Sequence, residues 1–544
     1  MNLFFLWGDI DLAYIIANKK YGGARASLAS GILGGTLSLT VSTVIVKLLG
    51  VLYKIPIANI LGDEGMGYFN SAYTVYAFFY LLATAGVPKA VMILVSESKA
   101  REGGINGRTI LRFATRTFLI LGTLTTLAFI ALSRPLAAAI GNDKSLHTMI
   151  AIAPSIVFVA LGGVMRGYLS ANLKFSSVAV SQILEGIGKL VFGLLFAMLA
   201  KVNNMPMPIV SAFTILGVTL GAIIGLLYLY ISARDTVDAG QKRQSLKRLD
   251  KKELRRRIFS ISVPITLSAA VMSITNVIDL GLIMRRLIEN GYIELEATSL
   301  YGNYTTLAVP MFNLVISLIT PVSIAFLPLL TEAVARGNKR GFSEISVSMI
   351  KLTSLLAAPL TVGMFVFSRE ILSLLFGNAG IDTGAPLLCM LAPALFFAVS
   401  LLLVNSSLEA CGAVRAPVIS MLLGSAVKVA VSYFLLGDVR FGISGAPLGT
   451  VASYAVALLV SLIIGYKRFG MRLPIFSGFL SPLVNALIAI LTSRLIFDSI
   501  LAAINPTLSL LIAIFISAIL YFTLTLFLGG VDFGKGKEVE YSEK

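Results

Sequence analysis

Long apolar runs separated by short polar segments follow one another from about residue 30 to residue 529. A helix needs roughly 20 apolar residues to cross a bilayer, and these runs are of that length. The pattern therefore predicts an all-α polytopic membrane protein with about fourteen transmembrane helices. The expected spans cover residues 30–57, 67–95, 113–133, 147–168, 176–200, 208–232, 258–284, 302–330, 350–368, 385–407, 416–436, 443–465, 475–495 and 507–529.

The first run carries a polar stripe. Thr40, Thr43, Lys47, Gly50 and Lys54 recur at steps of three and four, which places them on one face of a helix. An ammonium group inside a bilayer costs at least ~2.5 kcal/mol, so such a lysine is expected to face water or a partner. The stripe either lines a hydrated cavity that holds an anion, or Lys47 pairs with another helix while Lys54 reaches to the interface.

Composition excludes several classes of protein. With 57% hydrophobic and 13% charged residues, the chain is not a soluble globular protein. Its two cysteines fall in or beside apolar runs and it has one histidine, so neither a disulfide framework nor a transition-metal site is expected. Walker A, GxSxG and HExxH patterns are absent. We therefore expect a protein that is not an enzyme and needs no cofactor.

The net charge of +17 follows from membrane topology. Lysine and arginine concentrate in every second connecting segment, which predicts a multi-pass protein of the cell membrane with both termini in the cytoplasm. The largest basic segment, residues 233–257, is expected to rest on anionic lipid headgroups. It has no interleaved aromatic residues, so we expect no nucleic-acid partner.

An internal repeat divides the chain. Leu169–Leu190 aligns without gaps on Leu408–Val429, and the alignment places Lys189 on Lys428, each in the middle of an apolar helix. Chance similarity between apolar helices is the alternative. A repeat of six spans predicts two lobes related by an axis along the membrane normal, with a site between them. The expected parts are an N-terminal cytoplasmic or interfacial segment 1–28, an N-lobe 29–232, a linker 233–257, a C-lobe 258–466, a helix pair 467–529 and a cytoplasmic tail 530–544.

Ionisable residues inside the spans are few and mostly basic. We expect a cationic substrate-binding cavity with additional polar lining. Glu185 stands four residues before Lys189, which favours a helical ion pair that is internally neutral. The cationic residues are Lys47, Lys54, Lys189 and Lys428, and the polar lining is Thr43, Asn70, Glu185, Asn303 and Asn313.

Two further features have alternative interpretations. Asn276 and Asp279 lie one turn apart in the seventh span and could hold Na⁺ or carry a proton, or Asp279 could pair with Lys47 or Lys54. The acidic pair in the segment GDEGMG, residues 62–67, is expected in a solvated turn.

The segment KLLGVLYKIPIANILGDEGMGYFNSAYTVYAFFYLLATAGVPKAV (Lys47–Val91), together with AFLPLLTEAVARGN (Ala325–Asn338), resembles the polysaccharide-transport branch of the multidrug/oligosaccharidyl-lipid/polysaccharide (MOP) exporter superfamily. It is most similar to stage V sporulation protein B-like and lipid II flippase-like proteins of Gram-positive bacteria. The resemblance implies a monomer with two six-helix lobes, alternating access and a tail groove on the last two spans. The implied substrate is an undecaprenyl-pyrophosphate-linked saccharide, either lipid II or a related cell-wall or spore precursor.

The chain departs from this family in its cations. The family's first span carries arginines, where this chain has Lys47 and, near the next, Lys54; Thr305 stands where the eighth span has an arginine. Lysine is a point charge without the bidentate fork of arginine, so the anion must be held differently. A cation-coupled exporter of small amphipathic drugs and a non-transporting scaffold for cell-wall assembly are the alternatives.

Overall fold

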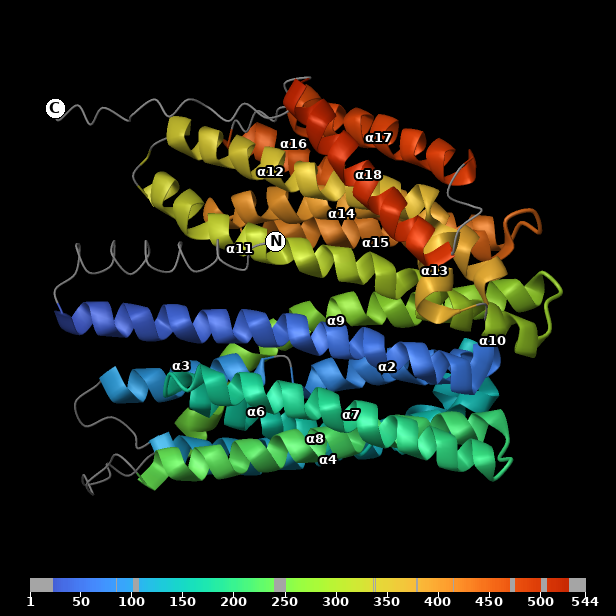
Figure 1. The fold of residues 1–544 in the computed structure, drawn as a ribbon. Helices are drawn as coiled ribbons and strands as arrows, with labels where there is room; N and C mark the ends of the chain where they lie inside the picture. The colour runs from blue at the N-terminus through green and yellow to red at the C-terminus, as the bar shows by residue number, and fades with distance from the viewer. Residues whose placement is uncertain are drawn as a thin grey trace, which may run out of the picture. The chain divides into compact units, whose positions relative to one another are not determined.

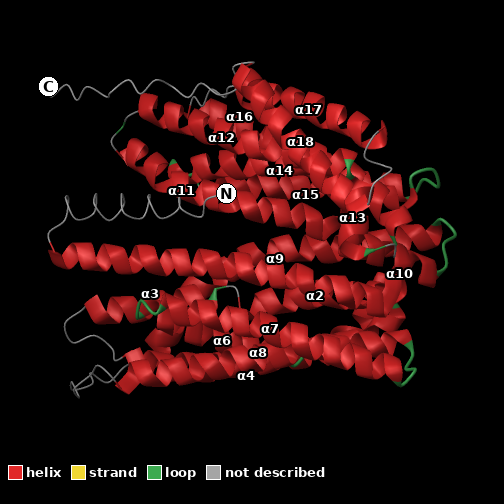
Figure 2. Ribbon diagram, viewed as in Figure 1, coloured by secondary structure: helices red, strands yellow, loops and turns green. Residues whose placement is uncertain are grey.

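The computed structural model describes residues 23–84, 86–100, 107–238, 251–335, 337, 339–377, 380–413, 415–469, 475–499 and 506–527. All regular structure in these ranges is helical, and they contain no strand (Figure 2). Twelve helices in the described part of the chain are long and apolar enough to cross a membrane. The prediction of an all-α polytopic membrane protein is confirmed.

The sequence predicted about fourteen spans, and the difference from these twelve helices arises in two parts of the chain. The first two expected spans are joined in one element, α2 (Gly23–Thr84), which bends at Gly62 instead of ending in a loop. Gly62 has φ 63° and ψ −173°, a conformation that is open to glycine and strained for other residues. The seventh expected span lies within α9 (Lys251–Glu289), whose 39 residues are sufficient to cross a bilayer.

The described helices belong to two compact units. The first consists of Met1–Met284 and Glu294–Gly302, and the second of Arg285–Ile293 and Asn303–Lys544. Most of α9 thus belongs to the first unit, although the sequence interpretation placed it at the start of the C-lobe. The predicted domain boundaries, including the six-plus-six division, stay a prediction.

In the first unit, α4, α6, α7 and α8 run side by side (Figure 1). Their buried faces and that of α3 form one apolar core that includes Val91, Ile110, Phe118, Val164 and Leu229. Besides α2 and α9, the elements of this unit are α3 (Val87–Ala100), α4 (Gly107–Ile140), η1 (Asp143–Ser145), α5 (Leu146–Ile152), α6 (Ser155–Ala171), α7 (Phe175–Val202), α8 (Met207–Asp238) and α10 (Glu294–Asn303).

The helices α7 and α8 approach each other closely. A Cβ atom on Gly217 would lie 2.4 Å from the backbone nitrogen of Gly193, and one on Gly221 would lie 2.5 Å from the carbonyl oxygen of Glu185. Small residues permit this close contact. In a membrane no hydrophobic driving force brings helices together, so van der Waals packing of this kind stabilises their association. The backbone of α7 is therefore fixed along the length that carries Glu185 and Lys189.

The second unit has two apolar cores, one around α14 and α16 and one around α12, α17 and α18. In the latter, the hydroxyl of Tyr521 donates to the carbonyl oxygen of Leu355 at 3.0 Å, which ties α18 to α12. The elements are η2 (Tyr304–Ala308), α11 (Val309–Ala335), α12 (Lys339–Val366), α13 (Ser368–Phe376), α14 (Ile381–Ala410), α15 (Arg415–Leu436), η3 (Gly442–Ser444), α16 (Gly445–Phe469), η4 (Ile475–Leu480), α17 (Ser481–Ser499) and α18 (Pro506–Phe527).

The segment GDEGMG is a packing site, and its prediction as a solvated turn was wrong. After Gly62 the chain is helical again, and Gly67 lies against the backbone of Thr298 on α10 so closely that a Cβ atom would be 2.2 Å from the Thr298 oxygen. The hydroxyl of Ser211 on α8 donates to the carbonyl oxygen of Gly65 at 2.7 Å. The glycines serve close helix contacts, which a pattern of turn-forming residues does not distinguish from a loop.

Candidate functional site

The ammonium group of Lys189 lies between two tyrosine rings. Its Nζ atom is 4.7 Å from the ring centroid of Tyr53 and 5.2 Å from that of Tyr73, both on α2. A cation over an aromatic face gains about 0.5–2 kcal/mol from the ring quadrupole, with the larger value at desolvated sites. Tyr53 is only 2% exposed, and within the described residues its buried hydroxyl has no hydrogen-bond partner. The rings hold the cation without neutralising it.

The neighbouring carboxylate of Glu185 forms an ion pair with Arg166 on α6. The two side chains are 31% and 16% exposed, so the pair is shielded on most sides. The expected ion pair between Glu185 and Lys189 is not the arrangement found, because the lysine ammonium lies over the rings instead. Sequence reasoning did not single out Arg166, although it falls inside the expected span 147–168.

Lys54 adds a further cation on α2. It is half-buried, and its ammonium lies within electrostatic reach of that of Lys189. Together with Arg166 and Glu185 these side chains make three cations and one carboxylate, on three helices of the first unit. We call this group the Lys189 site. Its excess of positive charge suits an anion with more than one charge, which ammonium and guanidinium groups bind through strong charge-assisted hydrogen bonds.

A row of aromatic side chains continues from this site along α2. Phe69 and Tyr73 stack with an interplanar angle of 6° and a centroid distance of 6.3 Å. Tyr73 is 5.7 Å from Tyr76, and Tyr76 is 5.8 Å from Tyr80, between ring centroids. The row therefore follows one side of the helix next to the cations. Stacked and tilted aromatic rings at these distances fix one another's orientation, which keeps the Tyr73 ring in place for Lys189.

Lys428 has a comparable setting in the second unit. It is half-buried on α15 and within electrostatic reach of Tyr454 on α16, whose ring centroid is 5.6 Å from that of Phe312. A Cβ atom on Gly449 of α16 would lie 3.2 Å from the carbonyl oxygen of Lys428. In the first unit a Cβ atom on Gly217 would lie 2.9 Å from the oxygen of Lys189. Both lysines thus stand where their helix meets a glycine of the following helix.

The remaining predicted residues are found in different environments. Asn70 on α2 and Asn303 at the end of α10 are buried, whereas Asn313 on α11 and Asn276 on α9 are exposed. Asp279, 8% exposed, is buried one turn beyond Asn276. Thr43 and Lys47 lie on α2, but their side chains are outside the described part of the structure. The structure thus brings Lys54, Glu185 and Lys189 together.

The described residues contain no group of three or more histidine, cysteine, aspartate or glutamate side chains that could hold a metal ion. Cys389 and Cys411 are free thiols. Asp279 belongs to no such group among these residues.

The arrangement of helices matches that of known transporters. A solved structure described as "Lipid II flippase MurJ, inward closed conformation" aligns with a TM-score of 0.69 and 17% identity, over 90% of this chain and 98% of that one. An inward-facing multidrug resistance MATE family transporter of the MOP superfamily aligns with a TM-score of 0.61 and 14% identity, over 80% of this chain and 98% of that one. The protein is therefore a multi-pass membrane protein with the MOP transporter fold.

The sequence pattern of the polysaccharide biosynthesis protein family matches residues 32–334, more than half of the chain. The chain belongs to this family. The MatE pattern matches residues 304–434 as well. Both matches confirm the predicted resemblance to the polysaccharide-transport branch of the superfamily.

Curated relatives come from Bacillus subtilis (strain 168). The lipid II flippase MurJ is 25% identical over 463 residues, which cover 81% of this chain and 84% of that protein. Stage V sporulation protein B is 23% identical over 434 residues, which cover 79% of this chain and 82% of that protein. These relatives include transporters and flippases rather than enzymes, so the prediction of a protein that is not an enzyme is confirmed.

Proposed function

We propose that this chain is a flippase that moves an undecaprenyl-pyrophosphate-linked saccharide across the cell membrane by alternating access. The substrate would be lipid II or a related cell-wall or spore precursor. The observation that carries the proposal is the Lys189 site, in which cations outnumber carboxylates inside a membrane-spanning helix bundle. The lipid II flippase among the relatives supports the same class of substrate.

The pyrophosphate is the part of such a substrate that needs a cationic site, since its charge is what keeps a lipid-linked saccharide on one side of a bilayer. Lys189 and Lys54 supply ammonium donors to its oxygens. Arg166 supplies a guanidinium whose direction is set by Glu185. The tyrosine rings hold the Lys189 ammonium before the anion arrives, so its geometry does not have to be established during binding.

The polyprenyl tail would remain in lipid along α17 and α18. Both helices expose large apolar side chains, as expected for surfaces in contact with acyl chains rather than water. The most exposed are Leu495, Phe515, Leu526 and Phe527. The tail groove on these helices is part of the proposal.

Further parts of the proposal concern coupling and orientation. Asp279 is the buried carboxylate that would bind Na⁺ or a proton, and the membrane potential is the other source of direction for an anionic headgroup.

Both termini would be cytoplasmic, and the basic segment 233–257 would lie against anionic lipids. We expect the protein to act as a monomer.

Complementation tests the proposed function. The full chain would be expressed in a Gram-positive strain depleted of its lipid II flippase, and growth and accumulated lipid II would be measured. We expect the wild-type chain to restore growth and lower the accumulated precursor, and Lys189→Gln to do neither. Lys144→Gln is the matched control, because it removes the same charge from an exposed side chain in η1. Failure of a well-expressed wild-type chain to lower the precursor would contradict lipid II as substrate.

The MatE match over residues 304–434 favours one second candidate, a cation-coupled exporter of small amphipathic drugs. Such an exporter is expected to use carboxylates for cationic drugs, whereas the Lys189 site has an excess of cations. Drug resistance conferred by the chain, without any effect on precursor levels in the depleted strain, would select this candidate.

A further inference from the structure

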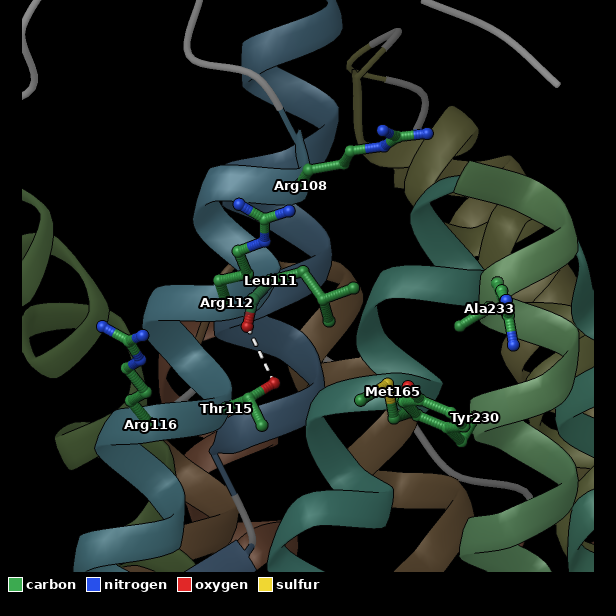
Figure 3. A pocket seen from close by; sticks show the side chains of 9 residues that line it. Arg108, Leu111, Arg112, Thr115, Arg116, Met165, Tyr230 and Ala233 are labelled. Atoms are coloured by element: carbon green, nitrogen blue, oxygen red, sulfur yellow. Dashed lines mark hydrogen bonds between the residues drawn. The ribbon is translucent and has the colours of Figure 1, made fainter. Parts of the chain in front are cut away.

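A pocket that shares no residue with the Lys189 site lies between α4, α6 and α8 in the first unit (Figure 3). Its volume is about 370 Å³. Nine residues line it, among them four arginines and no carboxylate. They are Arg108, Leu111, Arg112, Thr115, Arg116, Met165, Tyr230, Ala233 and Arg234.

Three of the arginines come from one face of α4. Arg108, Arg112 and Arg116 are four residues apart, so they follow one side of the helix, from which their side chains spread apart (Figure 3). The opposite face carries Ile110 and Phe118, which are buried in the core of the unit. The apolar face fixes the rotation of α4, and Arg234 on α8 completes the set of arginines that line the pocket.

The lining brings four guanidinium groups and no carboxylate to one pocket, and this excess of positive charge attracts an anion. The planar guanidinium fork matches a phosphate group with two parallel hydrogen bonds, which makes arginine the side chain best suited to this anion. The pocket walls also include Leu111, Met165 and Tyr230. The lining therefore fits a ligand with a phosphate at one end and an apolar body at the other.

The position of the pocket along its helices agrees with such a ligand. On α4, the arginine face ends at Arg116, and the exposed side chains Leu119 and Ile120 follow directly. On α8, Leu227 and Ile231 are exposed just before Arg234. Exposed apolar side chains mark the part of each helix that faces acyl chains. The arginines consequently stand at the depth of lipid headgroups, where Tyr230 has the amphipathic character typical of interfacial residues.

We propose that this pocket binds the phosphate of an anionic phospholipid, with the acyl chains lying on the exposed apolar faces of α4 and α8. Under the proposed orientation this end of both helices is cytoplasmic, and the cytoplasmic leaflet carries anionic lipids. A bound lipid would join α4 to α8 across α6, which contributes Met165 to the pocket. The proposal does not depend on the identity of the transported substrate.

Native mass spectrometry of the purified full chain tests the proposal. The protein would be delipidated in detergent and titrated separately with dioleoylphosphatidylglycerol, with dioleoylphosphatidylcholine and with inorganic phosphate. The test variant is Arg112→Gln with Arg116→Gln. The matched control is Lys467→Gln with Arg468→Gln, which removes the same charge from two exposed side chains of α16. Circular dichroism and the apparent melting temperature confirm that both variants are folded.

We expect one phosphatidylglycerol to bind the wild-type chain at least about tenfold more tightly than phosphatidylcholine, since a charge-assisted hydrogen bond is worth about tenfold or more in affinity. The pocket variant should lose this preference and the α16 variant should keep it. If both variants lost the preference for phosphatidylglycerol equally, the lipid would be attracted by basic residues in general, and the pocket would not be its binding site. If inorganic phosphate bound as tightly as phosphatidylglycerol, the proposal that a lipid occupies the pocket would be wrong.

Discussion

Lys189 and Tyr53 form a cation–π pair in which the ammonium nitrogen is 4.7 Å from the ring centroid. This relationship explains how a helix in the membrane can carry a lysine whose nearest carboxylate, Glu185, is engaged by Arg166. Aromatic rings stabilise the cation, but leave its three hydrogen-bond donors for an anion. A structural ion pair would have saturated the charge, whereas this arrangement keeps the site positive.

Replacing Lys189 should weaken binding of a pyrophosphate-bearing lipid. Lys189→Gln removes one charge-assisted contact, so we expect affinity to fall by about ten- to a hundredfold. Lys189→Arg keeps the charge and should retain most of the affinity. Titration of the purified chain with undecaprenyl pyrophosphate measures the effect, with Lys144→Gln as control. Equal affinities for wild type and Lys189→Gln would remove Lys189 from the binding site.

The fit of the Tyr53 ring depends on Gly193. A Cβ atom at this position would lie 2.7 Å from Cε2 of Tyr53, and the buried ring has little room to move. Gly193→Ala should therefore destabilise the protein by about 1–3 kcal/mol through overpacking and should also displace the ring from Lys189. Gly363→Ala is the control, because no atom lies within 4 Å of its added Cβ. Thermal unfolding of both variants checks the prediction, and a Gly193→Ala protein as stable as wild type would contradict it.

The Arg166–Glu185 pair predicts a double-mutant effect. Arg166→Gln leaves a shielded carboxylate without its partner, and Glu185→Gln leaves a shielded guanidinium, so each change alone should lower the apparent melting temperature. The double variant should be more stable than the sum of the two losses indicates, by at least about 1 kcal/mol. Strictly additive losses in the melting experiments would mean that the two side chains do not interact in the membrane.

The sequence predicted the helical class and Lys189 because both leave strong local signals. An apolar run longer than a bilayer thickness has few alternatives, and a lysine in the middle of such a run is costly wherever it points. The partners of Lys189 could not be found in the same way. Tyr53 and Tyr73 are 136 and 116 positions away along the chain, and only the packing of α2 against α7 brings them to the ammonium.

Two misses have a common physical cause. Arg166 was not singled out and the GDEGMG segment was assigned to a turn, because a charged residue or a glycine cluster near the end of an apolar run leaves the same sequence pattern whether it is solvated or packed. The outcome is decided by the neighbouring helix, which supplies Glu185 in the first case and Thr298 in the second. Neither neighbour is local in sequence, so no pattern of spacing could have indicated it.

Asp279 provides a test of coupling. If this buried carboxylate binds Na⁺ or a proton, Asp279→Asn should abolish the dependence of transport on the corresponding gradient while leaving binding of the lipid largely intact. Transport into or out of vesicles would be compared with and without each gradient. Glu289→Gln serves as the control, because it removes the same charge from an exposed carboxylate on the same helix. A gradient dependence that survives in Asp279→Asn would assign the direction of transport to another group or to the membrane potential.

The most direct test of the central claim is flipping by the purified chain in sealed vesicles. The substrate is undecaprenyl-pyrophosphate-linked saccharide with a fluorophore on the sugar, and a membrane-impermeant quencher reports how much is exposed outside. We expect the wild-type chain and Lys144→Gln to expose the substrate at least about tenfold faster than empty vesicles, and Lys189→Gln to lose most of this acceleration. No acceleration by the folded wild-type chain, or equal acceleration by Lys189→Gln, would contradict the account.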